Sequence, residues 1–147
     1  MGNQSTSATS AGLLRRLASG VYDLLLLAAL LMVLGIAVLI LRGGEAVPTG
    51  TLWWQALVLA CCTVFYAGFW ARGGQTLGMR TWRLRVQKVD GSPVDMKTSV
   101  LRFFSALAGL GLLWIPFDRD KRALHDRLAG TRVVLLTKDQ ARGLTSE

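Results

Sequence analysis

The sequence predicts an all-α membrane protein with a small β element outside the membrane, and three observations support this class. Residues 24–41 hold no charged side chain in eighteen positions, and residues 52–71 hold none in twenty. As helices these runs would be roughly 27 and 30 Å long, which matches the hydrocarbon core of a bilayer. Only 18% of the 147 residues are charged, whereas about one quarter are charged in an average soluble domain. A soluble globular protein is therefore excluded as the first interpretation.

The first helix is expected at about residues 13–41 and should start near Gly12. Residues 1–11 carry no apolar periodicity and are expected to form a disordered tail. The pair Gly43-Gly44 should end the helix, because glycine has low helix propensity. The run is longer than the apolar region of an ordinary secretion signal, so we expect it to remain as a membrane anchor.

The second helix is expected at about residues 52–71, after a short loop that contains Pro48 and Gly50. Trp53 and Trp54 open this run and Trp70 closes it. Indole rings favour the two interfaces of a bilayer, so these residues mark both ends of a span. The first and second helices should therefore be antiparallel neighbours.

A β-hairpin is expected at residues 82–94, because apolar and charged side chains alternate imperfectly up to the turn signal Asp90-Gly91. Residues 131–136 have the same β-branched character. Neither segment is long enough to be stable alone. We therefore expect residues 82–89 to pair with residues 131–136 in a short sheet beneath the membrane.

The third apolar element, at about residues 97–117, is interrupted by Arg102, Gly109, Gly111 and Pro116. A single crossing here would place the basic segment 72–97 and the basic tail on opposite faces, against the positive-inside tendency. A broken or re-entrant helix would instead keep every basic segment and both termini in the cytoplasm. We predict that arrangement. Residues 12–136 then form one membrane domain, and residues 137–147 form a flexible tail.

Several function classes are unsupported by the composition and motifs. The net charge of +8 is explained by membrane flanks, and no free basic helix with interleaved aromatic residues indicates nucleic-acid binding. Adjacent Cys61 and Cys62 form neither a disulfide framework nor a spaced metal site. No phosphate loop, dinucleotide fingerprint or nucleophile elbow is present. We expect no enzyme activity, no cofactor and no metal.

Arg16 and Asp23 lie seven positions apart, on one helical face and about 10 Å apart along the axis. They mark a polar stripe that faces other parts of the protein but are too distant for a relaxed direct ion pair. Either the two residues anchor the helix end at the interface, or Asp23 takes part in transport. Because both lie near the helix entrance, anchoring is the favoured interpretation.

A second polar cluster follows the third apolar element. It contains Asp118, Asp120, His125, Asp126 and Arg127. Such a cluster at a membrane entrance can relay protons or bind a cation. It can also form an interfacial salt-bridge network that fixes the tail beneath the helices, and this is the favoured interpretation. One histidine without a second His or a nearby Cys is a poor metal site.

These residues, together with three motifs, resemble the RDD family of membrane proteins over about residues 14–136. The motifs are the turn of Gly74, Gln75, Gly78 and Arg80, the Leu-Arg-Phe of residues 101–103, and His-Asp-Arg-Leu-Ala-Gly-Thr at residues 125–131. The resemblance implies that Arg16, Asp118 and Asp126 are the signature arginine and aspartates, with Asp120 the alternative for the second position. Met79 stands where many relatives have lysine.

The resemblance implies a multi-pass bacterial cytoplasmic-membrane protein whose function is usually unassigned, with sodium/proton exchange proposed for some members. Two function classes therefore remain. In an ion exchanger, Arg16, Asp23, Asp118 and Asp126 would line the pathway with support from Arg102, Asp120, His125 and Arg127. In a non-catalytic scaffold or assembly partner, the same charges would hold the fold. Partners are expected to be the lipid bilayer and a second copy or another membrane protein.

Overall fold

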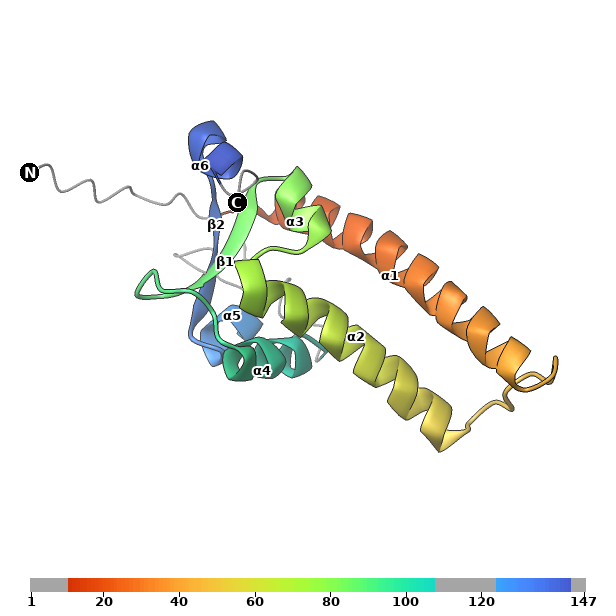
Figure 1. Ribbon diagram of the computed structural model, residues 1–147. Coiled ribbons are helices and arrows are strands. Elements are labelled where there is room, and N and C mark those ends of the chain that lie inside the picture. The colour runs from red at the N-terminus through yellow and green to blue at the C-terminus, as the bar shows by residue number, and fades with distance from the viewer. Residues whose placement is uncertain (1–10, 108–123, 144–147) are drawn as a thin grey trace, which may run out of the picture.

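The computed structural model describes residues 11–107 and 124–143. Helices α1 (Leu13–Leu41) and α2 (Leu52–Gly73) form a long antiparallel hairpin that projects from a body of shorter elements (Figure 1). The loop that joins them lies far from this body. The predicted bounds of α1 are confirmed, and α2 extends two residues beyond the predicted end at residue 71.

The short elements form a cap at the base of the hairpin. In chain order they are α3 (Leu77–Thr81), β1 (Leu84–Lys88), α4 (Met96–Leu107), α5 (Leu124–Leu128), β2 (Thr131–Leu135) and α6 (Lys138–Gly143). Helix α3 packs against α1, and α4 packs against α2. The cap is thus attached to both long helices.

Strands β1 and β2 pair antiparallel, with Leu84 opposite Leu135 and Lys88 opposite Thr131. The prediction that residues 82–89 pair with residues 131–136 is confirmed. The expected hairpin over residues 82–94 is wrong, because no strand follows the turn. The carboxylate of Asp90 accepts hydrogen bonds from the N–H and hydroxyl of Ser92, and Pro93 has no N–H to donate.

Both edges of this two-stranded sheet are covered by other parts of the chain. On the β1 edge, Val86 N–H donates to Gly74 O at 2.6 Å and Gln75 Nε2 donates to Leu84 O at 2.6 Å. On the β2 edge, Ala11 N–H donates to Val133 O at 3.2 Å. A two-stranded ribbon is marginal by itself, so these contacts supply support that the pair lacks.

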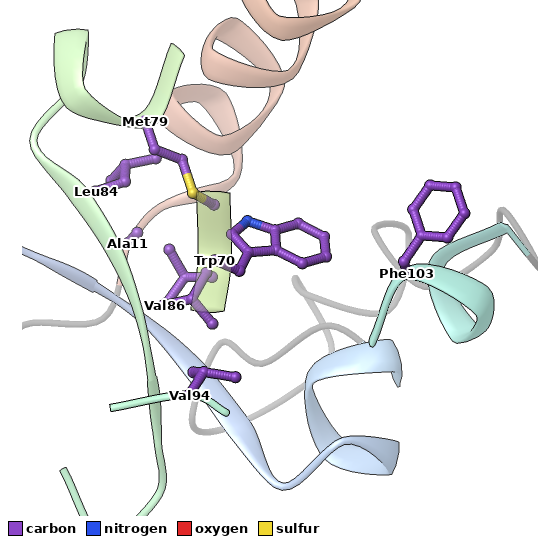
Figure 2. Close-up of a cluster of buried hydrophobic side chains, with 8 residues drawn as sticks. Ala11, Trp70, Met79, Leu84, Val86, Val94 and Phe103 are labelled. Atoms are coloured by element: carbon purple, nitrogen blue, oxygen red, sulfur yellow. The ribbon is translucent and has the colours of Figure 1, made fainter. Parts of the chain in front are cut away.

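The apolar core of the cap surrounds Trp70, at the end of α2. Figure 2 shows Met79 and Val86 pointing toward its indole ring from α3 and β1. The other buried members of the cluster are Ala11, Leu84, Val94, Phe103 and Val133. Ala11 was expected in a disordered tail but is fully buried, because it packs against this core and bonds to β2.

The third predicted helix, residues 97–117, is described only as α4, which ends at Leu107. The expected interruption at residues 109–116 lies outside the described residues. The strands on either side of this element, β1 and β2, are hydrogen-bonded neighbours.

Residues 138–143, expected within a flexible tail, form the short helix α6. Thr137 and Gln140 explain its start. Gln140 N–H donates to Thr137 Oγ1 at 3.3 Å, and Thr137 N–H donates to Gln140 Oε1 at 3.0 Å. This reciprocal pair is a capping box, which satisfies backbone donors at a helix N-terminus.

Helices α1 and α2, of 29 and 22 residues, are long and apolar enough to cross a membrane. Almost none of either apolar stretch is buried within the described structure. The core helix of a soluble protein would be covered by its own fold. The exposed leucines, valines and isoleucines of these helices are therefore suited to lipid rather than to water.

Candidate functional site

The first three turns of α1 present a buried polar stripe to the cap. Arg16, Ser19 and Asp23 are each less than 10% exposed, and Leu27 continues the same stripe. Their spacing of three or four residues places them on one helical face. As expected from their separation, Arg16 and Asp23 contact different partners, so the stripe divides into two sites.

At the first site, Asp126 receives two guanidinium groups. Arg16 Nη1 lies 2.5 Å from Asp126 Oδ2, and Arg102 Nη1 donates to Asp126 Oδ1. Asp126 is fully buried, and the two arginine side chains are 5% and 3% exposed. A protein tolerates a buried, ionised carboxylate when opposite charges and hydrogen bonds replace its water shell, and Asp126 has both.

Four elements meet at this carboxylate. Arg16 comes from α1, Arg102 from α4 and Asp126 from α5, while Thr131 Oγ1 at the start of β2 accepts from Arg102 Nη1 at 2.6 Å. Arg16 Nε also donates to Ala11 O at 3.2 Å. The guanidinium carbon of Arg102 lies 4.9 Å from the centre of the Trp70 ring, which is a cation–π distance.

Burial by itself would raise the pKa of Asp126, but the charges of Arg102 and Arg16 outweigh it and hold that pKa at about 2. His125 is next to this cluster, with Nε2 3.5 Å from Asp126 Oδ1. Burial and the charge of Arg102 lower the pKa of His125 to about 4, although the charge of Asp126 acts in the opposite direction. At neutral pH the carboxylate is ionised and the imidazole is neutral.

At the second site, Asp23 accepts hydrogen bonds from the turn before α3. The hydroxyl of Thr76 donates to Oδ2, and Gly78 N–H donates to Oδ1 at 2.8 Å. The same Thr76 oxygen accepts from Met79 N–H at 3.2 Å, which caps the helix. Asp23 is 3% exposed, and no Lys, Arg or His ion pair to it is present among residues 11–107 and 124–143.

Gly78 allows α3 to approach α1 this closely. A Cβ at this position would lie 2.3 Å from the carbonyl oxygen of Ser19 and 2.9 Å from Asp23 Cγ. Gly74 has an equally strict requirement, since its φ is +68° and a Cβ would lie 2.5 Å from Val86 O. The glycines of this segment are therefore contact points between α1, α3 and β1.

The predicted site residues have different outcomes. The structure brings Arg16, Arg102, His125 and Asp126 together, and it brings Asp23 to the turn of Gly74, Gln75 and Gly78. Arg80 and Arg127 are exposed. Asp118 and Asp120 lie outside the described residues.

Sequence reasoning missed Thr76 and Thr131, whose hydroxyls complete the two sites. Thr76 had a usable signal, because threonine before a short helical segment is a typical N-cap. For Thr131 the only signal was its place at the end of the motif at residues 125–131, since threonine is common in any strand.

The described residues offer no evident metal centre. Across residues 11–107 and 124–143, no group of three His, Cys, Asp or Glu side chains is placed to hold an ion. A cavity of about 320 Å³ lies between α2 and α4, and its lining is mainly apolar. Its lining residues are Trp54, Gln55, Val58, Leu59, Cys62, Phe103 and Leu107.

The profile of the RDD family matches residues 10–130, which include every residue of both sites except Thr131. The chain belongs to the RDD family. It is 36% identical over 92 residues to the uncharacterized protein YckC of Bacillus subtilis, covering 56% of this chain and 60% of that protein. It is 34% identical over 79 residues to the uncharacterized protein RP437 of Rickettsia prowazekii, covering 52% of this chain and 45% of that protein.

The chain thus covers less than two thirds of the length of either relative. No solved structure matches this chain. Family membership and the two apolar helices together support a membrane-associated protein.

Proposed function

We propose that this RDD protein is a multi-pass protein of the bacterial inner membrane that acts as a non-enzymatic scaffold. In this proposal α1 and α2 span the bilayer, and the cap presents a small folded surface to partner proteins on the cytoplasmic side. The observation that carries the proposal is the complete burial of Asp126 between Arg16 and Arg102. Such an arrangement suits a structural joint between the membrane helices and the cap.

The distribution of charge supports a cytoplasmic cap and a cytoplasmic N-terminus. The start of α1, the end of α2 and the sheet lie at one end of the hairpin (Figure 1). Residues 67–89 at this end hold five basic residues and no Asp or Glu. At the other end Arg42 lies 3.8 Å from Glu45. Basic segments remain in the cytoplasm when membrane proteins insert.

Reporter fusions after residues 12, 46 and 137 test this topology. The fusions after residues 12 and 137 should be active in a cytoplasmic reporter, and the fusion after residue 46 only in an external one. A tail reporter active outside the cytoplasm would contradict the proposed orientation.

The electrostatics of the Asp126 site also support a structural role. With a pKa of about 2, Asp126 stays ionised near neutral pH, and with a pKa of about 4, His125 stays neutral. A proton carrier must instead change protonation state during a cycle, and its pKa must lie near the working pH. We therefore assign Arg16, Arg102 and Asp126 to holding the cap on the membrane helices.

Stability and ion flux, measured on the same purified protein, test the scaffold assignment. Proteoliposomes with wild-type protein should show sodium, potassium and proton flux no higher than protein-free vesicles. Asp126→Asn should lower thermal stability in detergent. Wild-type flux above the protein-free background, abolished in a stable Asp126→Asn protein, would overturn the assignment.

A second candidate function, cation/proton exchange, is favoured by one observation at Asp23. Asp23 is a buried carboxylate in an apolar helix, and its described partners are a hydroxyl and an amide rather than a cation. Ionisable residues inside membrane helices often mark ion pathways. Two helices cannot enclose a pathway, so this function would require an oligomer of the chain.

Asp23→Asn distinguishes the two functions in proteoliposomes. Asn retains an acceptor for Gly78 N–H but cannot exchange a proton. Under the exchange mechanism, the wild-type protein carries a pH-dependent cation flux and the Asn variant loses that pH dependence. If the wild-type and Asp23→Asn proteins both showed only the flux of protein-free vesicles, the result would support the scaffold function.

A further inference from the structure

We propose that α3 and the adjoining end of α2 form a binding site for the headgroups of anionic phospholipids. The residues that would bind the phosphate are Arg72, at the end of α2, and Arg80, in α3. Trp82, which directly follows α3, would lie among the headgroups and glycerol groups. This inference rests on the membrane location proposed above.

The depth of α3 is set by its contacts with α1. Gly78 packs against the carbonyl of Ser19 and donates to Asp23, and Asp23 is the last charged residue before the uncharged run at 24–41. The uncharged run of α2 ends with Arg72, at the same end of the hairpin (Figure 1). Helix α3, which packs against α1 and follows α2 in the chain, therefore lies where hydrocarbon would give way to headgroups.

The exposed side chains of this region match that depth. Leu77 and Trp82 are 39% and 41% exposed, and Arg72 and Arg80 are also exposed. Tryptophan favours the bilayer interface because its ring is apolar and its N–H is polar. Arginine at the same level extends its apolar stem along the bilayer and its guanidinium to phosphate.

The arginines of this segment give it charge of one sign. Residues 67–89 hold Arg72, Arg80, Arg83 and Arg85 but no Asp or Glu, and the nearby Asp23 is buried; Lys88, at the end of the segment, pairs with Asp95 at 2.9 Å. A surface of this kind attracts the negative leaflet of a membrane. The planar guanidinium also donates two parallel hydrogen bonds to a phosphate, so arginine suits a phosphodiester. The partner is therefore a lipid phosphate, held at a fixed distance from the hydrocarbon by the adjacent helices.

Phosphatidylglycerol binding to the full-length protein in a neutral detergent tests the site. The probe is a short-chain phosphatidylglycerol, and binding is followed by native mass spectrometry at low ionic strength. The double variant Arg72→Gln/Arg80→Gln should bind roughly 30-fold more weakly, given the usual effect of two basic residues near an anionic surface. Arg42→Gln is the matched control at the opposite end and should bind as the wild type does.

The outcomes separate this site from its alternatives. Equal affinity of the wild-type and double-variant proteins for phosphatidylglycerol would overturn the proposal. If the wild-type protein bound phosphatidylcholine as tightly as phosphatidylglycerol, the surface would be a general lipid surface. If millimolar inorganic phosphate displaced the phosphatidylglycerol, the site would be one for free anions. Either result would overturn the proposal. Folding of the variant is checked by its thermal stability without lipid. A failed membrane location is recognised independently, because the protein would then leave the membrane fraction without detergent.

Discussion

Arg16 and Asp126 are separated by 110 positions in the chain, and their side chains meet at 2.5 Å. This contact joins the first helix to the segment that precedes the last strand. Arg102 binds the other oxygen of the same carboxylate, so this one side chain connects α1, α4 and α5. The cap therefore becomes complete only after nearly the whole chain is available.

Replacing Asp126 by Asn should destabilise the fold strongly. Asn has nearly the shape of Asp but no charge, so Arg16 and Arg102 would remain buried without their shared counter-ion. Breaking a buried ion network in this way costs about 3 to 5 kcal/mol. The expected result is a marked fall in the thermal unfolding temperature in detergent, with lower folded yield.

Glu45→Gln is the control for Asp126→Asn. Glu45 forms a longer pair with Arg42, and its side chain is 81% exposed. Exposed ion pairs contribute little to stability, so this variant should unfold at the wild-type temperature. Unchanged stability of Asp126→Asn would contradict the structural role of the signature residues.

The sequence was sufficient to predict the elements whose signals are local. The ends of α1 follow from uncharged length and a glycine pair, and the pairing of β1 with β2 follows from two short β-branched segments. The hairpin prediction failed because Asp90 and Ser92 form hydrogen bonds with each other, and turn propensity alone does not reveal that no returning strand follows.

The partners of the buried charges were less predictable. Helical periodicity placed Arg16 and Asp23 on one face, and the sequence placed Asp126 in a polar cluster. Only tertiary structure shows that Asp23 bonds to Thr76 and Gly78, because the contacts span 53 and 55 positions.

The stability of the protein should fall as the pH is lowered from about 6.5 to about 4, through His125. The unfolded chain protonates this imidazole near its ordinary pKa of 6.5, whereas the folded protein does so only near pH 4. Protons therefore favour the unfolded state in that interval. Thermal unfolding measured at pH 7.5, 5.5 and 4.5 should show the loss.

His125 is the only histidine, so His125→Asn removes the imidazole titration entirely. The variant should show a flatter stability profile between pH 7.5 and 4.5 than the wild type. A second loss is expected as the pH falls from about 4 to about 2, where Asp126 becomes protonated in the folded protein. Identical profiles for wild type and variant above pH 4.5 would exclude the assignment to His125.

Gly78→Ala should separate α3 from α1. The added Cβ would lie 2.3 Å from the Ser19 carbonyl oxygen, which belongs to a helix backbone and cannot move alone. We expect a large loss of folded protein, measured by size-exclusion chromatography in detergent. Gly73→Ala is the matched control, because a Cβ at residue 73 meets nothing within 4 Å. If both variants elute as the wild type does, the close packing of α3 on α1 is wrong.

Thr76→Val should weaken the attachment of α3 to Asp23. The hydroxyl of Thr76 both donates to the Asp23 carboxylate and accepts from Met79 N–H, so one substitution removes a buried hydrogen bond and a helix cap. Valine retains the shape of threonine, and the expected loss is about 1 to 3 kcal/mol of unfolding free energy.

Thr76→Ser keeps the hydroxyl and should recover most of the stability. Thr81→Val makes the same chemical change at the other end of α3. The exposed hydroxyl of Thr81 donates to Leu77 O at 3.2 Å within the helix, so the thermal unfolding temperature of this variant should hardly change. Equal unfolding temperatures for Thr76→Val and Thr81→Val would show that the bond to Asp23 does not support the fold, and Asp23 would then be free to serve a transport role.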